Sequence, residues 1–187
     1  MMEMVPSTRH SIAMSGGTDF LVWKLSSPEG RKKVRPLNSL TRKKLITRIA
    51  MSAEIAHCGG CHCKSVRWQV EAPSSVVAWS CNCSDCAMRA NIHFIVPYSK
   101  FKLLGDSEQS LTTYTFGTHT AKHKFCKICG ITSFYIPRSN PDGIAVTVNC
   151  VDSGTLKHVE IRRFDGRNWE SSYGKTSISS FSKSPEK

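Results

Sequence analysis

Residues 57–63 read His57-Cys58-Gly59-Gly60-Cys61-His62-Cys63, and this segment opens a series of closely spaced cysteines. The later groups are Cys81-Asn82-Cys83-Ser84-Asp85-Cys86 and Cys126-Lys127-Ile128-Cys129-Gly130. Cys61 and Cys63 of the first segment and the five cysteines of the later groups make up seven of the nine cysteines in the 187-residue chain. Thiolates spaced C-x-C and C-x-x-C are typical of zinc sites, so the pattern predicts a zinc-binding protein.

A disulfide framework is the competing interpretation of these cysteines, and it is favoured in short secreted chains. The chain opens with Met1-Met2-Glu3-Met4-Val5-Pro6, without the apolar segment of a secretory signal, and its cysteine count is odd. We therefore expect free thiols in an intracellular, reducing compartment, with the cytoplasm as first choice. No stretch approaches the roughly 18 apolar residues of a membrane-spanning helix, so we expect a soluble protein without a membrane partner.

Cys61, Cys63, Cys126 and Cys129 are expected to form a closed, structural zinc site. Residues i and i+2 of an extended strand point to the same side, so Cys61 and Cys63 can face one metal. Gly130 follows the second pair and can adopt the positive φ that closes a tight turn. Four thiolates leave zinc no open position, so this site should stabilise the fold.

Cys58 leaves an ambiguity, because Cys58 and Cys61 also form a C-x-x-C. The spacing alone does not distinguish between the two pairings. For Cys58 and Cys150 we expect buried thiols that pack as small apolar residues.

Cys81, Cys83 and Cys86 have no obvious fourth partner and predict a second, catalytic zinc, which makes two Zn²⁺ per chain. If His93 or His57 supplies a fourth ligand, this is a second closed, structural zinc site. If no residue does, three thiolates give the site a net charge of about −1, which weakens it as an activator of water. It still binds an incoming thiol, which loses its proton on coordination. The sequence thus points to a thiol-bearing substrate and to carbon–sulfur bond chemistry.

Such a reaction needs a residue that moves a hydroxyl proton, and histidine suits the task because its pKa lies near neutrality. His93 and His123 lie nearest the cysteine groups in the sequence and are our first candidates. Asp85, inside the second group, is the next. The plain alternatives are hydrogen-bonded core histidines and a loop carboxylate that accepts backbone hydrogen bonds.

Positive charge is concentrated towards the N-terminus. The net charge is +12, and residues 1–50 contribute +7, from ten Lys or Arg against three acidic residues. The rest of the chain is modestly basic, which suits an anionic small molecule as well as a nucleic-acid phosphate. It lacks the interleaved basic and aromatic residues of a single-strand binder. Candidates for binding substrate carboxylates are Arg89, Lys122 and Arg138, although each could equally be plain surface charge.

Composition divides the chain into three parts. Residues 1–50 contain no cysteine, and we expect a basic, disordered extension. Their Ser, Thr and Arg content is typical of an organelle transit peptide. Alternatively, Met51 is the start of the protein and the first fifty residues come from an upstream start. The basic runs at 31–33 and 42–44 are also typical of nuclear-import signals or nucleic-acid-binding patches. Residues 51–170 form the expected catalytic domain, and residues 171–187 a disordered Ser- and Lys-rich tail.

Apolar residues within 51–170 alternate with period two and include many β-branched and aromatic side chains, which predicts strands. Val66, Trp68 and Val70 share one strand face in this way, and no segment favours a long helix. We predict a mainly β fold, a small zinc-stapled structure of two packed antiparallel sheets with few or short helices. The predicted strands cover residues 66–70, 76–80, 92–96, 111–116, 133–136, 145–148 and 159–164.

The three cysteine groups, taken in order, closely resemble those of the glutathione-dependent formaldehyde-activating enzyme family. The resemblance covers about residues 57–170. Residues 93–97, 112–116 and 133–141 are most similar to the eukaryotic branch of this family that contains centromere protein V. The chain departs from the family at Lys64, where glycine is common, and in the additional thiol of Cys58.

The resemblance implies a mostly β, zinc-binding fold and carbon–sulfur lyase activity on a glutathione adduct such as S-hydroxymethylglutathione, with formaldehyde as the carbonyl product. It implies the same division of the cysteines into a structural and a catalytic set. The centromere protein V branch suggests a second hypothesis, a non-catalytic zinc-stapled interaction module with chromatin or cytoskeletal partners. The enzyme hypothesis predicts an open zinc position beside an anion-binding pocket, whereas the module hypothesis predicts two closed sites.

Overall fold

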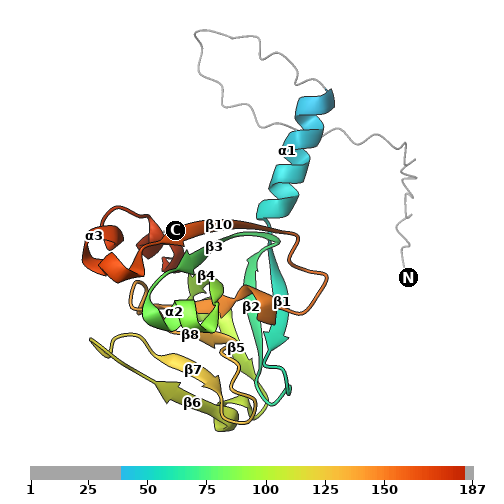
Figure 1. The fold of residues 1–187 in the computed structure, drawn as a ribbon. Helices are drawn as coiled ribbons and strands as arrows, with labels where there is room; N and C mark the ends of the chain where they lie inside the picture. Colours follow the sequence, from blue (N-terminus) through green and yellow to red (C-terminus); the bar gives the residue numbers. More distant parts are fainter. Residues whose placement is uncertain (1–38, 184–187) are drawn as a thin grey trace, which may run out of the picture. The chain divides into compact units, whose positions relative to one another are not determined.

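The computed structural model describes residues 39–183, with the side chains of residues 39–44 and 52–183. Strands dominate this part of the chain and form three sheets (Figure 1). Sheet A has the order β1 (Glu54–Gly60), β2 (Arg67–Pro73), β5 (Phe101–Leu104). Sheet B has the order β10 (His158–Phe164), β3 (Ser75–Cys81), β4 (Ile92–Pro97), β9 (Gly143–Thr147), β8 (Phe134–Tyr135). Sheet C pairs β6 (Leu111–Tyr114) with β7 (His123–Cys126).

The helices of this region are short. They are α1 (Ser39–Ser52), α2 (Ser84–Arg89) and α3 (Trp169–Tyr173). Five 3-10 segments join other elements: η1 (Tyr98–Lys100), η2 (Ser107–Ser110), η3 (Val148–Cys150), η4 (Gly166–Asn168) and η5 (Ile178–Ser182). Among residues 39–183, no helix has the length and apolar character needed to cross a membrane.

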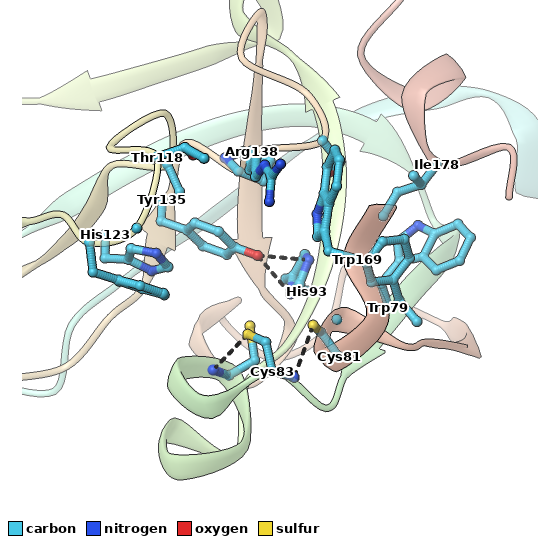
Figure 2. Close-up of a pocket in the computed structure, with 18 residues that line it drawn as sticks. Trp79, Cys81, Cys83, His93, Thr118, His123, Tyr135, Arg138, Trp169 and Ile178 are labelled. Carbon is cyan, nitrogen blue, oxygen red and sulfur yellow. Dashed lines mark hydrogen bonds between the residues drawn. The ribbon is translucent and has the colours of Figure 1, made fainter. Parts of the chain in front are cut away.

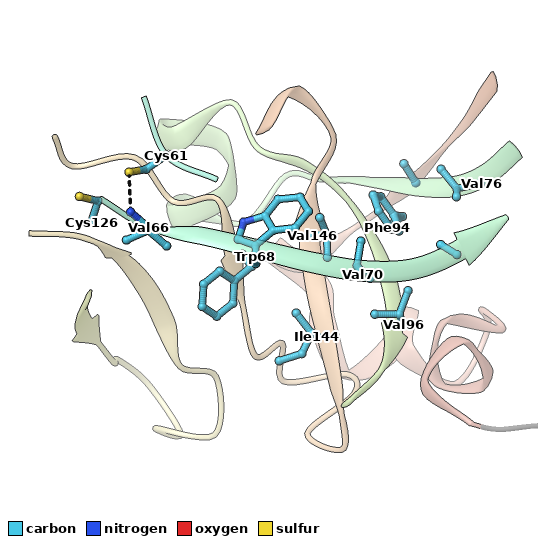
Figure 3. Close-up of a cluster of buried hydrophobic side chains, with 13 residues drawn as sticks. Cys61, Val66, Trp68, Val70, Val76, Phe94, Val96, Cys126, Ile144 and Val146 are labelled. Carbon is cyan, nitrogen blue, oxygen red and sulfur yellow. Dashed lines mark hydrogen bonds between the residues drawn. The ribbon is translucent and has the colours of Figure 1, made fainter. Parts of the chain in front are cut away.

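The main core lies between sheets A and B (Figure 3). Trp68 of β2 shares this apolar cluster with Phe94 of β4 and Val146 of β9. Trp68 and Val146 are completely buried, and burial of an aromatic side chain of this size dominates the packing energy of a small core. Cys61 and Cys126 belong to the same cluster, so the expected closed zinc site borders the core.

Two glycines of the opening segment are required by this packing. A Cβ atom at Gly59 would lie 2.2 Å from the Trp68 ring and 2.3 Å from the carbonyl oxygen of Cys150. One at Gly60 would lie 2.1 Å from the carbonyl oxygen of Val66. A Cβ at either position would therefore force backbone or a fully buried ring to shift, which destabilises the core.

The opposite face of sheet B carries a second apolar cluster. Successive side chains of a strand point to opposite faces, so Trp79 of β3, Ile95 of β4 and Tyr135 of β8 join this cluster instead of the main core. Residues after β10 pack against it, and Ile178 of η5 is one of its buried members. The same face of sheet B contributes side chains to the candidate active site.

Residues 171–187 were expected to form a disordered tail, and the structure corrects this as far as Lys183. Ile178 is 3% exposed, and the buried Asn140 side chain donates hydrogen bonds to the carbonyl oxygens of Ile178 and Ser179, at 3.0 and 3.1 Å. The sequence-based expectation rested on Ser and Lys content. A few apolar side chains and one buried amide are enough to hold the segment on sheet B.

The predicted mainly β class is confirmed, and each of the seven predicted strand segments overlaps a strand. Strands β1, β5 and β7 were missed; β5 and β7 have four residues each, and the glycine pair interrupts the apolar pattern of β1. A third sheet and one parallel pair, β10 with β3, correct the expectation of two antiparallel sheets. The chain between the two strands of this parallel pair runs through residues 82–157, and residues 148–157 form its last connection, from β9 to β10.

Helix α1 was not predicted either, and it spans the boundary that composition suggested after residue 50. Its Leu, Arg, Lys, Ala and Met residues favour a helix by intrinsic propensity, without an apolar stripe that would have revealed it. The basic side chains of Arg42, Lys43 and Lys44 are exposed on α1. The other basic run, residues 31–33, lies outside the described residues.

Candidate metal and active site

The cysteines of the expected closed site lie together, although they come from the turn after β1 and from β7 and the turn after it. The sulfur atoms of Cys61, Cys63, Cys126 and Cys129 all lie within 4.8 Å of one another. The Sγ of Cys63 is 3.5 Å from that of Cys61 and 3.6 Å from that of Cys126. Sulfur ligands about 2.3 Å from a tetrahedral zinc are about 3.8 Å apart, so this arrangement fits one zinc ion.

Two tight turns bring these cysteine pairs to one point. In the second turn, Gly130 has a φ of +74° and its N–H donates to the carbonyl oxygen of Cys126 at 2.8 Å. In the first turn, Lys64 has a φ of +66° and its N–H donates to the carbonyl oxygen of Cys61 at 3.2 Å. The left-handed conformation costs a residue with a Cβ roughly 1–2 kcal/mol. Lys64 therefore occupies a position that suits glycine.

The thiols of this site differ in acidity. Burial raises the pKa of Cys61 to about 12, and hydrogen bonds with Ser65 lower the pKa of Cys63 to about 6. The amide of Val66 donates to the Cys61 sulfur at 3.3 Å. A cation is needed to hold all four sulfurs as thiolates in such close contact, which again fits zinc.

The second group, Cys81, Cys83 and Cys86, forms where β3 ends and α2 begins. Cys83 caps α2, and its sulfur accepts a hydrogen bond from the amide of Cys86 at 3.5 Å. The Cys81 sulfur accepts one from the amide of Cys83 at 3.4 Å. Hydrogen bonds from Cys81 and Cys86 lower the pKa of Cys83 to about 2, while the pKa values of the other two thiols rise. One thiolate forms readily here, and three require a bound cation.

Contacts from the chain after β10 hold this cysteine loop in place. The Asn82 side chain donates to Asp165 Oδ1 at 2.9 Å and accepts from the amide of Arg167 at 3.1 Å. A Cβ at Gly166 would lie 2.4 Å from the sulfur of Cys81, so the backbone packs directly against the cluster. Contacts outside the three sulfurs therefore fix the shape of the loop, which suits a metal site.

No fourth donor joins the second group among residues 39–183. His57 is fully buried elsewhere, with its ring nitrogens 2.8 Å from Thr155 Oγ1 and 3.1 Å from the carbonyl oxygen of Ala72. His93 is hydrogen-bonded to Tyr135 and is not among the grouped ligand atoms. The group thus presents three sulfurs with one side open to solvent or substrate.

A cavity of about 170 Å³ opens beside these three sulfurs (Figure 2). Its walls are mostly apolar and come from both the second cluster of sheet B and the chain after β10. The lining residues include Phe116, His123, Tyr135, Arg138, Trp169 and Ile178. Thiol ligands, two histidines and one arginine therefore meet in a confined, largely apolar space.

His123 and Asp85 form a carboxylate–histidine pair at the wall of this cavity. Asp85 Oδ2 lies 3.0 Å from His123 Nδ1, and Arg89 Nε donates to Asp85 Oδ1 at 2.9 Å. The His123 ring is stacked between Tyr135 and Phe116, at 5.2 Å from each ring centre. Its buried Nε2 has no hydrogen-bond partner in the described part of the chain. Burial lowers the pKa of His123, which favours a neutral ring with Nε2 free to accept a proton.

His93 and Tyr135 form a second polar pair in the cavity wall. The Tyr135 hydroxyl lies 2.9 Å from His93 Nε2 and, in Figure 2, points towards His93 above Cys81 and Cys83. Burial lowers the pKa of His93 to about 4 and raises that of Tyr135 well above its usual value. Both side chains are therefore neutral near pH 7, and the hydroxyl keeps its proton.

The three predicted anion-binding residues occupy different surroundings. Arg138 lines the cavity, where its guanidinium lies 3.7 Å from the centre of the Trp169 ring. Arg89 donates to Asp85 Oδ1 and to Thr132 Oγ1, at 2.9 Å in each case, so its guanidinium is already occupied and fixes the Asp85 carboxylate. Lys122 is exposed and donates to the carbonyl oxygen of His119 at 2.8 Å, outside the cavity lining.

The remaining cysteines belong to neither group. Cys58 is exposed on β1, which corrects the expectation of a buried thiol, because its neighbours His57 and Gly59 take the inward-facing side of the strand. Cys150 is partly buried and packs against the main core, and burial raises its pKa to about 11. Cys58, the additional thiol that forms a C-x-x-C with Cys61, is not part of the four-sulfur group.

The sequence alone did not point to Tyr135, Trp169 or Gly166 as site residues. For Tyr135 a signal existed, because the alternation that places Phe134 in the main core places Tyr135 on the opposite face. For Trp169 and Gly166 none did, since their role depends on how the chain after β10 folds back over sheet B.

Comparison with known proteins gives two findings. A family model described as glutathione-dependent formaldehyde-activating enzyme matches residues 56–164. A crystal structure of a Rhodobacter sphaeroides protein is 34% identical, covers 56% of this chain and 99% of that chain, and has a TM-score of 0.48. The family match ends with β10, so Gly166, Trp169 and Ile178 lie beyond it.

Proposed function

The chain belongs to the family of glutathione-dependent formaldehyde-activating enzymes, and from this premise and the site we propose that it is a zinc-dependent carbon–sulfur lyase. The proposed substrate is a glutathione adduct such as S-hydroxymethylglutathione. The observation that carries the proposal is the buried Nε2 of His123, which has no hydrogen-bond partner within residues 39–183 and belongs to a residue that lines the cavity beside the three-cysteine group. A purely structural zinc site has no use for a buried, oriented proton acceptor.

We assign one zinc to each cysteine group, with Cys81, Cys83 and Cys86 as the ligands of the catalytic one. Zinc in that position favours a fourth sulfur ligand and stabilises it as a thiolate. The three-sulfur group lies in the cavity wall, where a substrate sulfur can approach it. The four-sulfur group is the structural site, because its ligand set is complete.

His123 is the proposed proton acceptor. In the cleavage direction its Nε2 takes the hydroxyl proton of the adduct, the oxygen forms a carbonyl double bond with carbon, and the carbon–sulfur bond breaks. The electron pair of that bond leaves with the sulfur, so glutathione departs as a thiolate. Asp85 holds Nδ1–H at 3.0 Å and stabilises the imidazolium, which then returns its proton to the sulfur or to solvent.

Tyr135 is placed to donate a hydrogen bond to the substrate oxygen. If the Nε2–H tautomer of His93 donates to the Tyr135 oxygen, the hydroxyl proton of Tyr135 is free to point into the cavity. A donor that is already oriented costs no rearrangement as the carbonyl forms or is attacked. His93 is then a positioning residue, and the proton transfer that it was first expected to perform belongs to His123.

The experiment is a glutathione titration of the full chain loaded with cobalt in place of zinc, combined with metal analysis and an assay of carbon–sulfur cleavage. We expect two metal ions per chain, a change in the cobalt spectrum as sulfur binds, and release of formaldehyde from the adduct. Cys83→Ser should abolish the spectral change. Two bound metals with no spectral change and no cleavage would instead favour the interaction-module hypothesis.

A further inference from the structure

Within the described part of the chain, the one charged residue that lines the cavity, Arg138, forms an ion pair with a solvent-exposed carboxylate, that of Glu170. Arg138 is the sole Lys, Arg, Asp or Glu side chain that lines the cavity within residues 39–183. Its guanidinium forms an ion pair with Glu170 of α3. The Arg138 side chain is 31% exposed, whereas that of Glu170 is 79% exposed. The carboxylate can therefore leave the guanidinium and become hydrated at small cost.

The guanidinium itself is held in place by aromatic stacking. It lies 3.7 Å from the centre of the Trp169 ring, and Trp169 is stacked on Tyr173 at 4.6 Å with an angle of 13° between the rings. Cation–π stacking keeps Arg138 oriented whether or not a carboxylate is bound. In this largely apolar cavity, a carboxylate bound to Arg138 interacts more strongly than it would in bulk water.

We propose that Arg138, stacked on Trp169, is the subsite for a carboxylate of the thiol substrate and that Glu170 occupies this subsite in the free protein. The inference rests on the proposed function and deepens it, because glutathione carries two carboxylates and the cavity offers one exchangeable cationic partner. Trp169 and Glu170 lie beyond the family match, which ends at residue 164. Substrate recognition in this chain thus depends on its C-terminal segment.

The test compares Glu170→Gln with the wild-type chain, both loaded with zinc, by calorimetric titration with glutathione and with glutathione diethyl ester. We expect the Kd for glutathione to fall about two- to fivefold, the range that loss of an exposed ion pair gives. The Kd for the diester should not change, because the ester has no carboxylate to exchange with Glu170. Glu160→Gln, which breaks the exposed pair with Arg162 outside the cavity, is the matched control and should change neither Kd.

Two further variants complete the test. Arg138→Gln should raise the Kd for glutathione about tenfold or more, as loss of a charge-assisted hydrogen bond predicts, with little effect on the diester. In the Arg138→Gln background, Glu170→Gln should have no effect. A rise in both Kd values on Glu170→Gln would overturn the proposal, since Glu170 would then bind the ammonium group that both ligands share. Equal Kd values for wild type and Glu170→Gln would overturn it too.

The lyase proposal and the subsite proposal fail in different ways. If glutathione binds, responds to Glu170→Gln as expected, but is neither cleaved from its adduct nor seen in the cobalt spectrum, the subsite stands and the lyase proposal falls. If the cobalt spectrum changes and cleavage occurs while Glu170→Gln has no effect, the lyase proposal stands and the subsite proposal falls. If glutathione does not bind at all, both fall.

Discussion

The two cysteine groups use the same ligand chemistry in different surroundings. Cys61 and Cys126 of the four-sulfur group join the main core, and a chain turn closes around each pair. The three-sulfur group lies on the other side of sheet B, in a cavity that it shares with His123 and Tyr135. Under the proposed function, the number of sulfurs decides whether a bound zinc has a position left for substrate, and the second face of sheet B supplies the groups that would act on that substrate.

Replacing one cysteine of each group by serine should give the largest difference in stability between the two groups. Cys126→Ser should abolish cooperative unfolding, because a structural zinc contributes about 10–16 kcal/mol in small zinc domains, comparable with or above the roughly 5–15 kcal/mol stability of a whole domain. Cys83→Ser should keep a cooperative thermal transition and bind one metal fewer. Thermal unfolding by circular dichroism and metal analysis measure both effects. Equal loss of structure in the two variants would show that the three-sulfur group is also structural.

His123→Gln tests the open site without touching a metal ligand. We expect carbon–sulfur cleavage to slow by about 10²–10⁴-fold, the usual contribution of a positioned acid–base group, while metal content and thermal stability stay the same. Because burial lowers the pKa of His123 below its ordinary value of 6.5, the ring stays neutral to lower pH. In the wild type, kcat/KM should therefore fall with acid only below about pH 6.5.

A control addresses packing at the same position, since the His123 ring is stacked between Tyr135 and Phe116. Asp85→Asn leaves this stack intact and removes the charge that raises the pKa of His123. It should reduce cleavage and move the acid limb of the kcat/KM profile to lower pH. A profile that stays in place in Asp85→Asn would contradict the role of His123 as the proton acceptor.

The ligand pattern of both groups could be predicted from spacing, because C-x-C and C-x-x-C impose local geometry wherever the chain goes. The strands could be predicted from their alternation, as with Trp68 and Val70. The candidates for the proton acceptor could be narrowed to His93, His123 and Asp85, but the sequence could not choose among them, since they differ in burial and in hydrogen-bond partners. Trp169 could not be predicted as a site residue, because its position depends on non-local packing of the chain after β10 against sheet B.

Alanine substitutions at two glycines should also distinguish the two cysteine groups, through smaller changes in stability and in metal binding. Gly59→Ala places a Cβ 2.2 Å from Trp68, and we expect a loss of about 1–3 kcal/mol in the free energy of unfolding, as for other overpacked cores. Gly166→Ala places one 2.4 Å from the Cys81 sulfur and should weaken metal binding at the three-sulfur group while the unfolding transition moves less. Denaturant unfolding and metal titration measure the two effects. The distinction fails if Gly166→Ala unfolds the core as readily as Gly59→Ala.

Lys64→Gly should have the smallest effect on the free energy of unfolding, and it should stabilise the protein instead of destabilising it. Lys64 and Gly130 occupy turns of the same site with φ of +66° and +74°, yet one of them is not glycine. Relief of the left-handed conformation should gain roughly 1 kcal/mol, less the added freedom of glycine in the unfolded chain. Lys64→Ala is the matched control, because it removes the same charge and keeps the Cβ; it should not stabilise the protein. Equal midpoints of denaturant unfolding for the two variants would mean that charge, and not backbone conformation, decides the stability of this turn.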